Sequence, residues 1–193
     1  MRHHLALAVI VGATLTGCAP STSAPNNEGP LEMSSPEPGA RIVTLIAESD
    51  GRERAVGNIR AVNTSDSGNV VITDVTAHEP LNVEIGVAKM LRLNNPGVEV
   101  AGTGYPIPPL PADDGFETTY PAWEATIDAR GAEVFPGERV NLVVGIQQVD
   151  ESRCSIINGV DVTYEVNGVA YVEAWNTAYV IEVVDGDGCM RDS

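Results

Sequence analysis

The stretch VDVTYEVNGVAYV, residues 160–172, decides the fold. Apolar and polar residues alternate on both sides of Asn167-Gly168, as is typical of β-strands with one buried face. Asn-Gly suits a two-residue type I′ turn, because both of its central residues need a positive φ. Such a turn pairs Val166 with Val169, Glu165 with Ala170, and Tyr164 with Tyr171. The valine and tyrosine pairs share one face, which we expect to be the core face.

The rest of the domain repeats this pattern of short strands. Further β-branched and apolar runs cover residues 70–75, 81–87, 98–100, 123–127, 140–146 and 178–184. Turn formers such as Asn94-Asn95-Pro96-Gly97 separate them. Val87 to Leu93 comes closest to helical spacing, and one helical turn there is the alternative. The pattern predicts an all-β domain over residues 41–193, built as an antiparallel β-sandwich.

The N-terminus predicts export. Residues 2–4 are basic, and an apolar stretch from Leu5 to Leu15 follows. About 20 apolar residues are needed to span a membrane, so this stretch fits the core of a signal peptide better. Leu15-Thr16-Gly17-Cys18 looks like a lipobox. The lipobox implies cleavage after residue 17 and lipid attachment to Cys18, whose acyl chains would anchor the protein to the outer face of the membrane. A conventional secretory signal with a chance cysteine is the alternative.

The remaining two cysteines predict a disulfide. If Cys18 carries lipid, Cys154 and Cys189 are left as an even pair in an oxidising compartment. One difficulty is geometric. If residues 160–184 form three strands that run up, down and up, the segments that carry Cys154 and Cys189 begin at opposite ends of these strands. A disulfide needs the two Cα atoms within about 7 Å of each other. The tail after residue 184 must therefore fold back.

Residues 18–40 are expected to be a flexible tether. This segment is rich in Ser, Thr, Asn and proline, with almost nothing to bury. Its prolines are Pro20, Pro25, Pro30, Pro36 and Pro38.

The net charge of the chain limits which classes of partner it can bind. The chain has 11 Lys and Arg against 27 Asp and Glu, a net charge of −16. Cleavage after residue 17 removes Arg2 and no acid, which leaves −17. Such a surface repels nucleic acids and anionic lipid headgroups. Cations and basic proteins are the partners that it favours.

Several segments near the C-terminus carry a resemblance. They are Phe135-Pro136-Gly137-Glu138, Leu142-Val143-Val144-Gly145, and Gly159 to Tyr164 with the hairpin to Tyr171. Together they resemble small actinobacterial lipoproteins that carry an immunoglobulin-like domain of unassigned function. The resemblance covers about the last 60 residues and implies an immunoglobulin-like β-sandwich. The chain departs from true immunoglobulin domains, because no early and late cysteine bracket a strand-C tryptophan.

The chain lacks the residues that most catalytic mechanisms require. His78 is the only histidine after residue 17, and His78-Glu79 does not continue into a zinc-binding HExxH motif. No Gly-x-Ser-x-Gly motif accompanies it, so we expect His78 to be a plain turn residue before the strand at 81–87. Asp185-Gly186-Asp187-Gly188 resembles the start of a calcium loop, in which Asp185 and Asp187 are candidate ligands. A hydrolase that uses carboxylates alone is a third possibility.

The segment from Tyr105 to Tyr120 is the candidate binding loop. Its prolines exclude a central strand, and loops of this length in compact domains are often functional. Tyr105, Phe116 and Tyr120 would supply an apolar ridge, unless they pack into the core. The sequence thus predicts a membrane-anchored extracytoplasmic lipoprotein with a non-catalytic domain that binds or scaffolds another cell-envelope protein. A calcium-binding lipoprotein is the alternative.

Overall fold

The computed structural model of the protein describes residues 28–37, 39, 42–46, 53–93 and 123–183. These residues form a mostly β domain with three sheets. The five-stranded sheet contains, in spatial order, β1 Leu31–Met33, β3 Arg54–Asn63, β8 Arg139–Gln148, β5 Val83–Arg92 and β6 Ile127–Asp128. The four-stranded sheet contains β11 Val169–Trp175, β10 Gly159–Val166, β4 Val70–His78 and β7 Glu133–Val134. The three-stranded sheet contains β2 Ile42–Ile46, β12 Ala178–Glu182 and β9 Ser155–Ile157.

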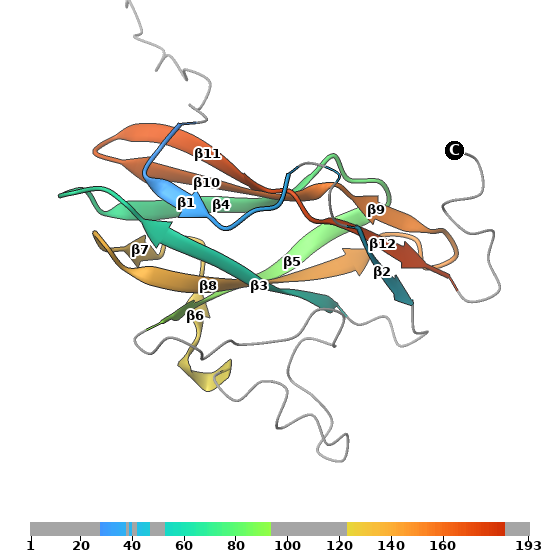
Figure 1. Cartoon of the computed structure of the whole chain (residues 1–193). Coiled ribbons are helices and arrows are strands. Elements are labelled where there is room, and N and C mark those ends of the chain that lie inside the picture. Colours follow the sequence, from blue (N-terminus) through green and yellow to red (C-terminus); the bar gives the residue numbers. More distant parts are fainter. Residues whose placement is uncertain (1–27, 38, 40–41, 47–52, 94–122, 184–193) are drawn as a thin grey trace, which may run out of the picture.

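The two larger sheets lie in separate layers, with β10 and β11 above β3 and β8 in Figure 1. One hydrophobic core joins the sheets. Its largest fully buried side chains include Tyr164, Leu31, Ile59, Ile72, Met90 and Leu142. All pairs within these two sheets are antiparallel, so the prediction of an all-β domain with antiparallel sheets is confirmed.

The hairpin at residues 160–172 forms in the predicted register. Val166 pairs with Val169 and Tyr164 with Tyr171, and the turn residues Asn167 and Gly168 have φ angles of 52° and 78°. Tyr164 is fully buried, which confirms the core face on β10. Val169 is 43% exposed, so the prediction is wrong for this residue. It is the first residue of β11 and directly follows the exposed turn residues Asn167 and Gly168.

Three β-bulges break the period-two pattern of the central strands. On β5 the register with β8 shifts between Ile85 and Ala88, and this places Ala88 and Met90 on the core face. The extra residue reverses which positions face inward. The structure therefore contradicts the helical alternative for Val87 to Leu93. Similar shifts occur on β3 between Val56 and Ile59, and between β4 and β10 at Thr163 and Tyr164.

Arg130 connects the bulges of two different sheets. Its guanidinium bonds to Asp74 Oδ1 at 3.1 Å and donates to the Val75 carbonyl at 3.0 Å, both on β4. It also donates to the Gly86 carbonyl on β5 at 3.3 Å. Because β4 and β5 belong to opposite layers, this side chain links the two sheets at the point where both strands are irregular.

The folded domain begins earlier in the chain than the tether prediction placed it. Residues 31–33 form β1 and pair with β3, and Leu31 is fully buried. The expected tether over residues 18–40 is therefore wrong for this segment. Two apolar residues among prolines are a weak sequence signal. They become ordered because β3 offers a strand to pair with and Tyr164 offers its hydroxyl oxygen to the Leu31 amide at 3.2 Å.

The end of the chain leaves the hairpin instead of adding to it. After β11, the chain turns at Asn176, whose amide donates to Ser35 Oγ at 2.7 Å. β12 then pairs in parallel with β2 and antiparallel with β9, forming the third sheet at the right-hand end of Figure 1. A simple two-sheet sandwich does not contain this sheet.

The outer face of the five-stranded sheet carries a second apolar cluster. Ala55, Leu91 and Val143 are buried there, and Trp123 packs against them. The predicted strand at 123–127 is wrong at its start, because Trp123–Ala125 is a 3-10 turn. Among the described residues, no helix has the length and apolar character to cross a membrane.

Candidate functional site

Most of the predicted site residues lie outside the described part of the chain. They are Cys18, Tyr105, Phe116, Tyr120, Asp185, Asp187 and Cys189. The lipid anchor, the 105–120 binding loop and the calcium site therefore stay predictions. Within the described residues, no group of three or more His, Cys, Asp or Glu side chains could hold a metal ion.

Cys154 is the described member of the predicted Cys154–Cys189 pair, since Cys189 lies outside the described residues. The residue directly precedes β9, in which Ser155 pairs with Ile181 of β12. Continuing this antiparallel register places Cys154 beside Glu182, which is seven residues before Cys189. β12 therefore ends at the same end of its sheet as Cys154. The three-strand arrangement that created the geometric difficulty does not occur, and the bridge remains a prediction.

His78 is the last residue of β4 and contacts Asp161 of β10. Its Nδ1 lies 2.9 Å from Asp161 Oδ2, and the two side chains are 40% and 25% exposed. The register explains the pair, because His78 is opposite Gly159, two residues before Asp161 on the same strand. The prediction of a plain turn residue is therefore incomplete. A carboxylate can orient an imidazole for catalysis, but no hydroxyl or thiol of the described residues is recorded bonded to His78.

Tyr164 and Tyr171 support the N-terminal segment. Their rings stack with centroids 5.5 Å apart. Gly29 lies against both rings, and a Cβ at this position would overlap the Tyr171 ring. The segment before β1 can therefore approach β10 and β11 closely only because residue 29 is glycine. The N-terminal segment therefore lies against the core-side face of β11. The lateral edge of β11, where a further strand could pair, is a different surface.

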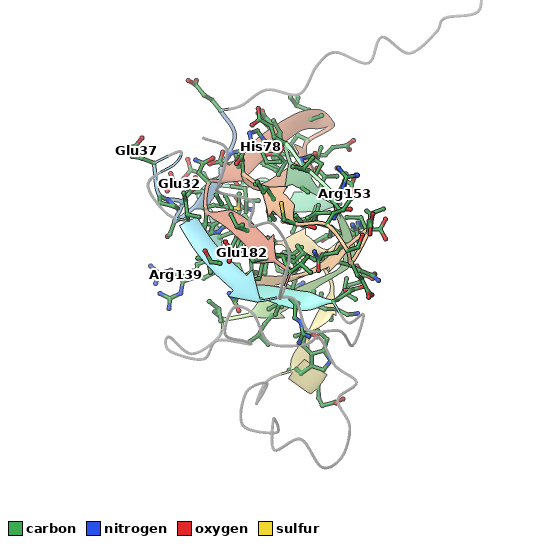
Figure 2. All side chains as sticks on the ribbon, turned by 90° about the vertical axis from the view of Figure 1, so that its right-hand side faces the viewer. Glu32, Glu37, His78, Arg139, Arg153 and Glu182 are labelled. Atoms are coloured by element: carbon green, nitrogen blue, oxygen red, sulfur yellow. The ribbon has the colours of Figure 1, made fainter. Side chains whose placement is uncertain are left out.

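Glu173 is an acidic residue on this core-side face. Partial burial raises the pKa of its carboxyl above the ordinary value of 4.5, and the nearby Glu32 on β1 raises it further. Figure 2 shows Glu32 at the surface, on the same side of the domain as Glu37. Glu32 on β1 and Glu173 on β11 thus add negative charge to this side of the domain.

The lateral edge of β11 pairs with no other strand in the described part of the chain. β11 stands first in the order β11-β10-β4-β7, so β10 is its one paired neighbour among the residues that the structure describes. It is seven residues long, whereas the other outer strands of the two large sheets, β1, β6 and β7, have two or three residues. Natural edge strands are usually short, or are protected by lysine, proline, a bulge, an inward-pointing charge or a covering loop, and Glu173 is the one inward-pointing charge of β11. The sequence VAYVEAW of β11 contains no lysine or proline, and its pairing with β10 has no register shift.

The turn geometry shows which β11 groups face outward. In an antiparallel strand, successive residues bond alternately to one side and to the other. The two-residue turn joins the Val166 carbonyl to the Val169 amide, so the odd-numbered residues of β11 bond to β10. The backbone groups of Ala170, Val172 and Ala174 therefore point away from the sheet. The amide of Asn176 continues this alternation, because it bonds to Ser35 and not to β10.

This edge could not be predicted from the sequence. The pattern of residues 160–172 predicts a hairpin with one core face, but a run of apolar residues alone does not show whether a strand has one neighbour or two. The Asn176-Thr177 turn marks the end of β11 in the sequence, but it does not show whether the chain then returns alongside β11 or turns away.

No protein-family model, curated protein or solved structure matches this chain.

Proposed function

We propose that this protein is a membrane-anchored extracytoplasmic lipoprotein whose β domain binds or scaffolds another cell-envelope protein without catalysing a reaction. The observation that supports this proposal is the edge of β11, a seven-residue strand with outward-facing backbone groups and with no lysine, proline or bulge. A strand edge of this length is a liability unless a partner uses it.

The lipid anchor on Cys18 limits where that partner can be. Because Gly29 and β1 already belong to the folded domain, the tether that we propose runs from Cys18 to Gly29 and not to residue 40. Eleven residue steps span at most about 40 Å when fully extended. The domain would therefore stay close to the membrane, and its partner would be a protein of the envelope with a segment within this distance.

We further propose that the two larger sheets correspond to the layers of an immunoglobulin-like sandwich, as in the actinobacterial lipoproteins that the sequence resembles. Residues 135–138, the turn in which part of this resemblance lies, are stabilised by contacts with Arg92. Arg92 Nη1 lies 2.6 Å from Glu138 Oε2, and its guanidinium lies over the Phe135 ring at 5.2 Å from the centroid. These residues thus favour a shared fold and say nothing of a ligand.

In-cell photo-crosslinking tests the proposed function. A photo-reactive residue is placed singly at Val172 on the β11 edge, within residues 105–120, and at the exposed Val149 in the turn after β8. We expect at least one of the first two positions to trap a specific envelope protein, whereas Val149 serves as the control. If none of the positions traps a defined protein, the binding function is wrong.

A further inference from the structure

We infer that β11 is a site of β-strand addition, at which an extended, basic segment of another protein pairs antiparallel with residues 170–174. This inference rests on the proposed binding function and gives it a mechanism and a class of partner. The added strand would become the fifth member of the four-stranded sheet, beyond β11. Antiparallel pairing continues the arrangement of this sheet, in which all neighbouring strands are antiparallel.

The backbone of β11 supplies the attachment points. Ala170, Val172 and Ala174 together direct three N–H and three C=O groups outward, which suit an extended peptide backbone. Their own side chains point to the outer face of the sheet and are small, so they do not obstruct an approaching strand. Ser35 and Pro36 contact Asn176 and limit the open edge on the C-terminal side.

Acidic side chains beside the edge of β11 favour a basic partner segment. On the outer face, Glu165 of β10 pairs with Ala170, and Asp161, which also contacts His78, pairs with Ala174. A partner residue opposite either alanine lies two strand spacings from these acids, about 9–10 Å between backbones. Because the alanine methyl is short, a long Lys or Arg side chain can extend over it toward the carboxylate. On the other face, Glu173 adds a third acid.

The same charges disfavour a second copy of this chain as the occupant. Two β11 strands could pair symmetrically about Val172, but each chain has a net charge of −16. Association would bring together two acidic surfaces, which repel each other at moderate ionic strength. A cationic segment gains from the charges that a second copy would oppose.

The spacing on the partner follows from the register. Residues opposite Ala170 and Ala174 are four apart and share one face, while the residue opposite Val172 lies between them on that face. A matching probe is the fluorescent peptide Thr-Lys-Thr-Val-Thr-Lys-Thr, which puts its lysines opposite the alanines and its valine opposite Val172. The control probe replaces both lysines by glutamate.

The experiment measures binding of the two probes to the full chain by fluorescence anisotropy. We expect the lysine probe to bind at least about tenfold more tightly than the glutamate probe, and added salt to weaken its binding. Val172→Pro removes an outward N–H that β10 does not use, as proline on an edge strand can do without breaking the sheet. It should weaken the lysine probe roughly tenfold, whereas the matched control Val172→Thr keeps the N–H and should bind within about twofold of the parent.

A charge variant keeps the test decisive if Val172→Pro does not fold. Glu165→Lys should weaken the lysine probe several-fold, while Glu151→Lys makes the same charge change in the turn after β8 and should leave binding nearly unchanged. The inference is overturned if the lysine probe does not bind, if folded Val172→Pro binds like Val172→Thr, or if sedimentation shows a dimer that Val172→Pro disperses. In those cases a partner crosslinked from positions other than β11 would still support the proposed binding function.

Discussion

Asn63 is the side chain whose removal should most clearly weaken the fold. It is fully buried at the end of β3, and its Nδ2 donates to the carbonyls of Gly68 and Val134, both at 2.8 Å. Its Oδ1 accepts from the Ser65 amide at 3.0 Å. One amide side chain therefore holds the β3–β4 turn and joins it to β7 in the opposite sheet.

The magnitude follows from these three bonds. A typical intramolecular hydrogen bond contributes about 1 kcal/mol net, and a buried group left without its partner costs more. Gly68 O keeps a second donor, Ser65 Oγ, and Val134 lies opposite Val70 in the β4–β7 ladder, so the full penalty falls mainly on the Ser65 amide. We expect Asn63→Ala to lower the free energy of unfolding by about 2–4 kcal/mol. For a domain of this size, that corresponds to a fall of roughly 4–16 °C in Tm.

Urea denaturation followed by circular dichroism measures this effect, with the slope m expected to stay unchanged. Asn69→Ala is the matched control, because Asn69 is exposed and its Nδ2 donates to Glu133 Oε2 at 3.2 Å on the protein surface. The control should cost less than about 0.5 kcal/mol. If the two alanine variants differ by less than that amount, the argument that Asn63 links the two sheets is refuted.

Three further predictions concern single residues. Cys18→Ser should abolish lipidation, so that the protein leaves the membrane fraction; a variant that still pellets with membranes through its N-terminus contradicts the anchor. Mass spectrometry after alkylation without reductant should find Cys154 and Cys189 joined, and two alkylated thiols in the folded protein would exclude the bridge. The raised pKa of Glu173 means that the folded state binds its proton more tightly than the unfolded state, so stability falls as pH rises through that pKa. Glu173→Gln should therefore raise Tm relative to the parent at pH 7 and not at pH 4, and an equal change at both values would contradict this.

The hairpin could be predicted in detail because its determinants are local. Asn167-Gly168 fixes the turn, and the turn fixes every pair from Val166–Val169 outward. The bulges could not be predicted in this way. Gly86 allows the β5 bulge, but the bulge also needs Glu53, whose Oε2 accepts the Val87 amide at 3.1 Å. Such a contact between distant segments leaves no periodic signal in either of them.

β1 and the β11 edge were missed for a related reason. Leu31 is buried because Asn63 and Tyr164 lie beside it, and neither is near it in the sequence. Whether β11 has a second neighbour depends on where β12 goes after Asn176. Local propensity identified both strands of the hairpin, but the position of a strand within its sheet is a property of the whole topology.

Amide hydrogen exchange along β11 tests the central claim most directly. It is read residue by residue by NMR on the free, isotope-labelled protein. The account predicts an alternating pattern, with slow exchange at the odd-numbered residues that bond to β10, Tyr171, Glu173 and Trp175. Fast exchange is expected at the outward-facing residues, Ala170, Val172 and Ala174. Uniform slow exchange at all six amides would show that the edge is already covered in the free protein, and would contradict the claim that β11 is open for a partner.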